Sequence, residues 1–424
     1  MANSKQITVY SYGKINLSLD VLGVTNDGYH EVEMIMQAIL LHDDVKIKWK
    51  PAPILKQDAF KRENDKDDAQ TDANPAGSRF KIKLHTNLPY VPDDERNIAY
   101  KAALLMHERF GKGKSGKQDA AEETSRMSMQ AETEKVSDAD ATHAGSKNRN
   151  VKEICGEVEI NIKKRIPVAA GLAGGSGNGA AVIMGLAYLW ELDLTLEELM
   201  ELGAQLGSDV PFSVMSQAAC NGMFGYKGEK MAATCALASG RGTALRPLKA
   251  LKSDVLLCKP DLSVSTAEVY HGIDGCVIDE HPDNAELEKA IVRFNEAKSA
   301  AEKRVENKTA SSSGDEIKSE SGNAPETKSE GFTEIRPKET SKDRYDMLRK
   351  NMLNVLEKYT LHRYDKVRST KDCIEKNTEN GEIVLMSGSG PTIFALCDSR
   401  EAAKDLAEKV KGKRRQTLVT RTLI

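Results

Sequence analysis

Residues 169–182 read AAGLAGGSGNGAAV, a run of small residues between a proline and a long apolar segment. A glycine-rich turn between a strand and a helix lets backbone N–H groups approach phosphate oxygens, and the helix N-terminus adds positive potential there. The stretch is neither a Walker motif, which needs Gly-Lys-Ser/Thr, nor a dinucleotide G-x-G-x-x-G in a parallel βαβ unit. It fits a tight strand-to-helix turn with close backbone packing equally well. By itself it therefore leaves phosphate binding and a purely structural turn open.

Alternating strands and helices must position this stretch. Apolar and polar residues alternate over 79–86 and 156–167, which predicts two strands, the second ended by Pro167. The β-branched segment 7–23 predicts two short strands broken at Gly13. Segment 96–111 predicts an amphipathic helix, and segment 180–192 predicts a buried apolar helix. Segment 382–410 predicts a strand, a glycine turn, a second strand and a helix in succession.

A further helix is predicted at the start of segment 195–212. Thr195 and Glu198 make a capping box, and Gly207 marks the helix end. Asp209 therefore falls on the following turn, where an aspartate commonly serves as an N-cap for the next segment.

The chain of 424 residues has a formal net charge of −3, so its composition gives no signal for binding nucleic acid or anionic membranes. Its seven cysteines are scattered without a C-x-x-C pair, which favours reduced thiols over disulfides or a zinc site. The N-terminal residues lack the apolar core of a signal peptide, and no run reaches membrane-spanning length. We therefore expect a cytoplasmic protein without nucleic-acid or membrane partners.

Hydrophobic residues make up 39% of the chain and charged residues 29%, which indicates that part of the chain stays outside the core. Three polar segments poor in aromatic residues account for this: about 55–79, 112–151 and 298–343. They cannot bury enough apolar surface to offset the entropy of ordering, so we predict mobile insertions. Without them a core of about 310 residues remains.

The chain carries five motifs in an order that resembles the GHMP small-molecule kinases: GKINLSLDVLG…DGYHEVEMIMQAI, IPVAAGLAGGSGNGAAV, LGSDVPF, KPDLSVSTAEVY and MSGSGPTIFAL. The stretches DGYHEVEMIMQ and VSTAEVY are similar to one family among them. That family phosphorylates the 2-hydroxyl of 4-diphosphocytidyl-2-C-methyl-D-erythritol in non-mevalonate isoprenoid precursor biosynthesis. The resemblance implies ATP and Mg²⁺ as cofactors, a small cytidine diphosphate-linked polyol as substrate, and a monomer or homodimer.

The resemblance also implies an α+β fold of two domains with a deep cleft between them. Residues 1–245 are expected to form the N-terminal, ATP-binding domain, and residues 246–424 the C-terminal domain. The first domain is expected to contain a left-handed βαβ crossover, a rare exception to the usual hand. The second is expected to have a ferredoxin-like fold.

Two catalytic residues follow from the resemblance, and no residue is assigned as a metal ligand. Lys14 matches the lysine that faces the acceptor hydroxyl, where a fixed cation favours alkoxide character and stabilises charge on the transferred phosphoryl group. Asp209 matches the base that accepts the hydroxyl proton. Local sequence also allows a surface lysine on a strand and a simple N-cap.

The resemblance assigns Tyr29 and His30 to the cytosine of the substrate, with the tyrosine ring stacking and the histidine region hydrogen-bonding the base edge. Tyr270 is expected to form a second aromatic wall, since two rings around a planar base give affinity without a charge. Asn16 and Thr266 are expected to contact the methylerythritol or the diphosphate. A tyrosine and a histidine in a turn also fit a surface loop.

ATP binding is assigned by the resemblance to the glycine-rich segment and to one further residue. Asn97 matches a position near the adenine, although an asparagine at a helix start also fits a cap. The other expected ATP contacts are Pro167, Ala170, Gly171, Leu172, Ala173, Gly174, Gly175, Ser176, Gly177 and Asn178.

The glycine-rich segment departs from the family pattern at Ala173, Gly177 and Gly179. Gly177 lacks a hydroxyl that would contact a phosphate or the metal hydration shell, which predicts a slower or weaker-binding kinase. Gly177→Ser is then expected to raise kcat/KM for ATP. Residues 216–234 also look longer than the family's turn, with no role that the sequence explains.

Three functions remain open on the sequence: the kinase described above, a GHMP kinase for another small alcohol, and a non-catalytic nucleotide-binding relative. Tyr29 and Tyr270 favour the first over the second, because a pocket for mevalonate or homoserine needs no base-stacking pair. The presence of both Lys14 and Asp209 argues against the third.

Overall fold

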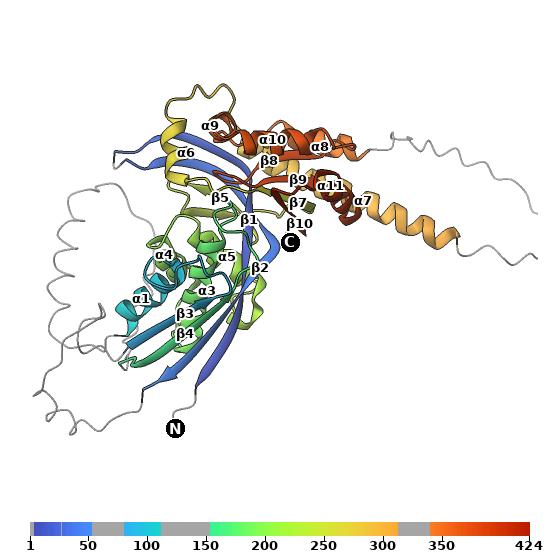
Figure 1. Ribbon diagram of the computed structural model, residues 1–424. Helices are drawn as coiled ribbons and strands as arrows, with labels where there is room; N and C mark the ends of the chain where they lie inside the picture. The colour runs from blue at the N-terminus through green and yellow to red at the C-terminus, as the bar shows by residue number, and fades with distance from the viewer. Residues whose placement is uncertain (1–3, 27, 53–79, 112–152, 313–339) are drawn as a thin grey trace, which may run out of the picture.

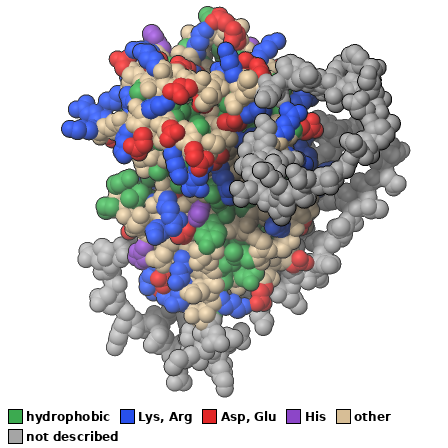
Figure 2. All heavy atoms as spheres, turned by 90° about the vertical axis from the view of Figure 1, so that its right-hand side faces the viewer, with side chains coloured by type: hydrophobic (Ala, Val, Ile, Leu, Met, Phe, Trp, Pro, Cys, Tyr) green, Lys and Arg blue, Asp and Glu red, His purple; other side chains and the backbone are tan. Residues whose placement is uncertain are grey.

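The computed structural model describes residues 4–26, 28–52, 80–111, 153–312 and 340–424. Its strands form two sheets, each covered by helices (Figure 1). Acidic and basic side chains are interspersed on the face that Figure 2 shows, in agreement with the small net charge. The predicted insertions fall outside the described residues over 55–79, 112–151 and 313–339.

Within the described residues, the first sheet contains six strands in the order β3-β4-β2-β5-β6, with β1 paired to β2. β1 and β2 are antiparallel and pair from Lys5 with Trp49 to Val24 with His30. The bounds are β1 Lys5–Val24, β2 His30–Pro51, β3 Phe80–Thr86, β4 Gly156–Lys163, β5 Cys235–Ser239 and β6 Ala244–Pro247.

β1 is one long strand, so the prediction of two short strands broken at Gly13 is wrong. The register with β2 shifts between Tyr12 and Gly13, but pairing continues on both sides. The glycine-rich segment lies directly against β1 here, because the backbone N–H of Lys14 donates a 3.1 Å hydrogen bond to the carbonyl oxygen of Leu172. A Cβ at Gly13 would make only ordinary contacts, 3.4 Å from that oxygen and 3.5 Å from Cδ1 of Ile166.

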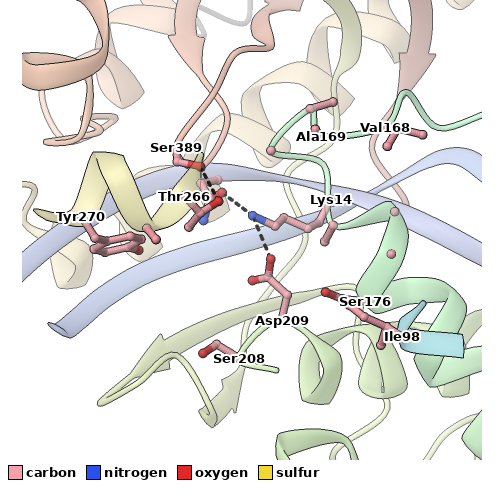
Figure 3. Close-up of a pocket in the computed structure, with 18 of the residues that line it drawn as sticks. Lys14, Ile98, Val168, Ala169, Ser176, Ser208, Asp209, Thr266, Tyr270 and Ser389 are labelled. Atoms are coloured by element: carbon pink, nitrogen blue, oxygen red, sulfur yellow. Dashed lines mark hydrogen bonds and ion pairs between the residues drawn. The ribbon is translucent and has the colours of Figure 1, made fainter. Parts of the chain in front are cut away.

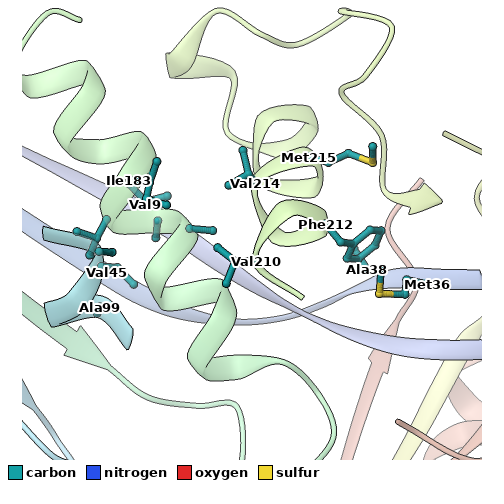
Figure 4. Packing of buried hydrophobic residues seen from close by; sticks show 14 of the residues in the cluster. Val9, Met36, Ala38, Val45, Ala99, Ile183, Val210, Phe212, Val214 and Met215 are labelled. Carbon is teal, nitrogen blue, oxygen red and sulfur yellow. The ribbon is translucent and has the colours of Figure 1, made fainter. Parts of the chain in front are cut away.

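Helices pack together on one face of the first sheet: α1 Ile98–Phe110, α3 Gly174–Leu189, α4 Leu196–Ala204 and α5 Val210–Cys220, followed by the short η2 Gly222–Phe224. β3 and β4 are parallel neighbours joined through α1, which is the expected βαβ unit. The predicted capping box at Thr195 and Glu198 is confirmed at the start of α4. α3 is the central helix, and its Ile183 lies among Val9 and Val45 of the sheet in a fully buried cluster (Figure 4).

The second sheet has the strand order β10-β7-β9-β8, and its neighbours are antiparallel. α10 and α11 pack against it. The chain order β7, helices, β8, β9, α11, β10 is the βαββαβ arrangement of a ferredoxin-like fold, as predicted. The bounds are β7 Asp254–Pro260, α6 Thr266–Ile273, α7 Asn284–Ser312, α8 Ser341–Arg349, α9 Glu357–Arg363, α10 Asp365–Glu375, β8 Ile383–Met386, β9 Ile393–Cys397, α11 Arg400–Val410 and β10 Arg415–Arg421.

The prediction of a polar insertion over 298–343 is wrong at both ends. α7 continues to Ser312, and α8 begins at Ser341. α7 is polar overall because it buries only part of its surface, with Phe294 fully inside the core. Lys298, one turn further on, is also buried. The prediction failed at its start because the helix that buries Phe294 continues past residue 298 as a polar helix.

An apolar core joins the two sheets. Ile15 and Ile39 of the β1–β2 ribbon are fully buried together with Leu257 and Phe394 of the second sheet. The chain leaves the first sheet after β6 and enters the second at β7. The domain boundary between residues 245 and 246 stays a prediction.

Candidate active site

A cavity of about 950 Å³ is lined by elements of both sheets. Its walls come from β1, β2, the glycine-rich segment before α3, the turn before α5, the helix α6 and the turn between β8 and β9 (Figure 3). A cavity of this volume is large enough for a nucleotide-sized ligand.

The glycine-rich segment reaches α3 through three residues in left-handed backbone: Ala169 (φ 49°), Gly171 (φ 72°) and Ala173 (φ 55°). Gly171 cannot be larger, because a Cβ there would lie 2.1 Å from the carbonyl oxygen of Ser387. Ala173 is the N-cap of α3, and no side chain hydrogen-bonds the helix end at this cap. The N–H groups of the first turn therefore face the cavity without a side-chain acceptor from the cap, which is the arrangement that binds an anion.

Lys14 and Asp209 meet in the cavity (Figure 3). Lys14 Nζ lies 3.7 Å from Asp209 Oδ2 and donates a 2.7 Å hydrogen bond to Asn16 Oδ1. The Lys14 side chain is only 6% exposed, so it is not a surface lysine. Asp209 stands at the N-cap position of α5, but its side chain makes no capping hydrogen bond. Its carboxylate faces Lys14 instead, and neither side chain has the simple structural role that local sequence allowed.

Thr266 and Asn16 lie beside this pair. Thr266 begins α6, and its Oγ1 is 3.0 Å from Oγ of Ser389 in the turn between β8 and β9. Asn16 receives the hydrogen bond from Lys14, and its Nδ2 contacts the sulfur of Met34 at 3.2 Å. Polar groups from both sheets therefore converge at Lys14.

Aromatic side chains form another part of the cavity wall. The rings of His30 and Tyr270 have centroids 5.1 Å apart, and His30 Nε2 lies 2.7 Å from Asp274 Oδ1. Burial raises the pKa of the Tyr270 hydroxyl, so this side chain is neutral. The guanidinium carbon of Arg241 lies 3.8 Å from the centroid of the Tyr29 ring. The arrangement offers flat ring faces next to fixed polar groups.

Most of the predicted site residues line this one cavity, although their roles toward ligands stay predictions: Lys14, Asn16, Tyr29, His30, Asn97, Pro167, Ala170, Gly171, Ala173, Gly174, Gly175, Ser176, Asn178, Asp209, Thr266 and Tyr270.

Two of the predicted ATP contacts do not line the cavity. Leu172 is buried in the core, where its carbonyl oxygen accepts a 3.1 Å hydrogen bond from the backbone N–H of Lys14. Gly177 lies inside α3, and a Cβ there would lie 2.6 Å from Oγ of Ser11 on β1. The prediction of a missing hydroxyl at Gly177 is therefore wrong, because a side chain at this position points into the packing between α3 and β1.

Asn97 lines the cavity but is also a helix cap. Its Oδ1 accepts a 3.0 Å hydrogen bond from the backbone N–H of Ala99, and its Nδ2 donates to the carbonyl oxygen of Pro92 at 2.7 Å. Both polar atoms of the Asn97 side chain are therefore engaged in holding the start of α1.

The cavity also contains polar residues that sequence reasoning missed: Lys164, Ser208, Arg241, Asp274 and Ser389. Ser389 belongs to the predicted glycine turn in SGSGP, which was the available signal for it. Arg241 and Asp274 are single charged residues outside the motifs, and only folding brings them to Tyr29 and His30.

Residues 216–234, which the sequence left unexplained, pack at the far end of α3. The Tyr226 hydroxyl donates a 2.6 Å hydrogen bond to the carbonyl oxygen of Leu194, and the Phe224 ring contacts that of Tyr188. Asn221 bonds both backbone polar groups of Tyr10 on β1. The stretch therefore stabilises the end of α3 that is remote from the glycine-rich segment.

Within the ranges that the structure describes, no group of three or more His, Cys, Asp and Glu side chains is arranged to hold a metal ion. No helix of the same ranges is long and apolar enough to span a bilayer.

Family models match both parts of this fold. The model of the GHMP kinase N-terminal domain matches residues 140–217, and that of the GHMP kinase C-terminal domain matches residues 338–415. A crystal structure of 4-(cytidine 5'-diphospho)-2C-methyl-D-erythritol kinase is similar in fold, with a TM-score of 0.55 at 21% identity over 99% of this chain and 100% of that one. The protein is thus a small-molecule kinase of the GHMP class.

Curated relatives narrow the class. A 4-diphosphocytidyl-2-C-methyl-D-erythritol kinase of Clostridioides difficile (strain 630) is 33% identical, over 96% of this chain and 93% of that protein. Another from Alkaliphilus metalliredigens (strain QYMF) is 32% identical, over 97% and 95%. The chain belongs to the 4-diphosphocytidyl-2-C-methyl-D-erythritol kinase family.

Proposed function

We propose that this protein transfers the γ-phosphoryl group of ATP to the 2-hydroxyl of 4-diphosphocytidyl-2-C-methyl-D-erythritol. Membership of the family supports the substrate. The observation that carries the assignment is the pair of the buried Lys14 and the half-buried Asp209, which lies in one cavity together with the N-terminal turn of α3 and the ring of Tyr270. A kinase for this substrate needs these three features together.

ATP is assigned to the part of the cavity at the glycine-rich segment. The N–H groups at the start of α3 carry partial positive charge and suit the phosphate oxygens. Gly174 and Gly175 line the cavity, and a Cβ at Gly174 would lie 2.9 Å from Cγ2 of Ile166, so this glycine lets the turn pack closely on Ile166. Mg²⁺, carried in by ATP, would neutralise charge that develops during the transfer.

Asp209 and Lys14 are assigned to the chemical step. Asp209 accepts the proton of the 2-hydroxyl, the hydroxyl oxygen forms a bond to the γ-phosphorus, and the bond to the bridging oxygen breaks to release ADP. Lys14 stabilises the negative charge on the attacking oxygen and on the transferred group. The side-chain oxygen Oδ1 of Asn16 accepts a hydrogen bond from Lys14 Nζ and holds the ammonium group in place.

The cytosine is assigned to the aromatic part of the cavity. Tyr270 offers a ring face for stacking, and His30, whose Nε2 is paired with Asp274, offers Nδ1 for the base edge. Tyr29 is the second predicted ring, with the Arg241 guanidinium over its face. We further infer that the enzyme acts in the cytoplasm and works as a monomer or homodimer.

Initial rates over a panel of alcohols with ATP and Mg²⁺ test the function. We expect kcat/KM for the cytidine diphosphate-linked polyol to exceed that for mevalonate or homoserine by about 10³ or more, because a base-binding subsite adds several kcal/mol. Addition of EDTA is expected to abolish the rate, and excess Mg²⁺ to restore it. Equal or faster turnover of an alcohol without a base would assign the protein to another GHMP activity.

A further inference from the structure

Asp43 of β2 is a fully buried carboxylate that accepts four hydrogen bonds. Its Oδ1 accepts from the backbone N–H groups of Arg165 (2.6 Å) and Ile166 (2.9 Å). Its Oδ2 accepts from Lys164 Nζ (2.5 Å) and Asn178 Nδ2 (3.0 Å). The carboxylate is saturated with donors and lies outside the set of residues that line the cavity.

These donors belong to the two ends of the glycine-rich segment. Lys164, Arg165 and Ile166 lead into it from β4, while Asn178 lies in α3 just after it. Lys164 Nζ also donates a 2.9 Å hydrogen bond to Asn178 Oδ1. The Asp43 carboxylate and the Lys164 ammonium group therefore connect the residues that precede the glycine-rich segment to Asn178 in α3.

The segment between these ends is held at its middle, where the carbonyl oxygen of Leu172 accepts a hydrogen bond from the Lys14 N–H and that of Gly171 accepts one from Ser387 Oγ. No side-chain hydrogen bond caps the turn at the start of α3. The segment contains glycines and three residues in left-handed backbone, one of them the alanine N-cap. N–H groups bind an anion well only when they are already oriented toward it, because ordering them on binding costs entropy. A fixed link between the two ends adds to that order.

We propose that Asp43 and Lys164 form a positioning pair that holds the ATP-binding segment in its binding conformation. This inference rests on the proposed function for the identity of the phosphate ligand. Asp43 acts through Lys164, Asn178 and the backbone of the segment. Lys164 lines the cavity and also donates a hydrogen bond to Asp43.

Asp43→Asn and Lys164→Met test the pair. Each is expected to raise KM for ATP, and the Kd of a non-hydrolysable ATP analogue measured by calorimetry, by about tenfold or more. KM for the cytidine diphosphate-linked polyol is expected to change by less than about twofold, since the contacts at Tyr270 are untouched. The double variant Asp43→Asn/Lys164→Met is expected to be less impaired than the two single effects combined, because it leaves no unpaired buried charge.

Asp44→Asn is the matched control. Asp44 is the next residue on the same strand and forms an ion pair with Arg165, with both side chains partly exposed. We expect this variant to leave both KM values unchanged. Equal effects of Asp43→Asn and Asp44→Asn, or a parallel rise in both KM values for Asp43→Asn, would overturn the proposal.

The double variant Asp43→Asn/Lys164→Met decides the question if Asp43→Asn alone does not fold, because it removes the link without leaving an unpaired buried charge. It too is expected to weaken binding of the ATP analogue by about tenfold, and unchanged affinity would overturn the proposal. Calorimetry with the analogue needs no acceptor alcohol. An error in the proposed acceptor would therefore appear in the turnover assay alone and leave this test intact.

Discussion

Lys14 Nζ stands 3.7 Å from Asp209 Oδ2, although the two residues come from β1 and from the turn before α5. The shortest contact of the Lys14 ammonium group is with the neutral amide of Asn16. The lysine charge is therefore held in place without a short bond to a carboxylate. This arrangement suits a cation that must act on a phosphoryl group and a carboxylate that must accept a proton.

Asp209→Asn keeps the size of the side chain but removes the base. We expect kcat to fall by about 10² or more while the affinity for an ATP analogue stays the same. Lys14→Met, which removes the cation, is expected to lower kcat to a similar extent. Steady-state kinetics and analogue binding measure both effects. Loss of ATP affinity with retained turnover in either variant would show that the assigned roles are wrong.

Tyr270→Ala removes the proposed stacking surface. Stacking of a base on an aromatic ring is worth about 1–3 kcal/mol, so KM for the cytidine-containing substrate is expected to rise by roughly 5- to 150-fold. Tyr270→Phe is the control, since it keeps the ring and is expected to keep KM within about threefold. A larger effect of either variant on KM for ATP than on KM for the polyol would contradict this assignment.

Gly177→Ser is expected to destabilise the protein and to give no gain in kcat/KM for ATP. The new Cβ meets Ser11 Oγ at 2.6 Å and the backbone oxygen of Tyr12 at 3.2 Å. Overpacking of this kind costs about 1–3 kcal/mol, which lowers the melting temperature by several degrees. Gly222→Ala is the control, because its Cβ has only a 3.9 Å contact with Lys227. An unchanged Tm for Gly177→Ser together with faster turnover would restore the idea of a missing hydroxyl.

Glu157 of β4 contributes to the free energy of unfolding in a way that depends on pH. Hydrogen bonds from Lys50 and Lys83 lower the pKa of Glu157 from 4.5 to about 2. The folded state therefore binds fewer protons than the unfolded state between these values, so the contribution is complete above about pH 4.5 and is lost as the pH falls toward 2. Urea unfolding of the wild type and Glu157→Gln should differ most at neutral pH and converge near pH 2. A difference that persists in acid would contradict the pKa assignment.

Local patterns predicted much of the fold because they depend on near neighbours in sequence. The capping box at Thr195 and the alternation over β3 and β4 fix elements without reference to the rest of the chain. The break predicted at Gly13 failed because the pairing of β1 with β2 absorbs the glycine as a register shift and continues on both sides of it. The insertion predicted over 298–343 failed at its start because composition does not show how far a helix continues: α7, which buries Phe294, extends to Ser312 through mostly polar residues.

Site residues that stand in a family motif could be predicted from the sequence. Site residues that only tertiary contacts bring together could not. Lys14, Asp209 and Tyr270 stand in recognisable motifs and share one cavity. Gly177 was misjudged because sequence spacing does not tell which side of a helix faces a ligand. Asp43 hydrogen-bonds residues at both ends of the glycine-rich segment, but it lies on a strand more than a hundred residues earlier. No local sequence pattern marks it.

The most direct test of the central claim is to identify the product that the purified protein forms from ATP, Mg²⁺ and 4-diphosphocytidyl-2-C-methyl-D-erythritol. Phosphorus NMR and mass spectrometry report both the transfer and its position. The account predicts one new phosphomonoester, on the 2-hydroxyl, with one ADP formed for each product molecule, and a rate about 10² or more lower in Asp209→Asn. No transfer by the wild type, or transfer to a different hydroxyl, would contradict the account.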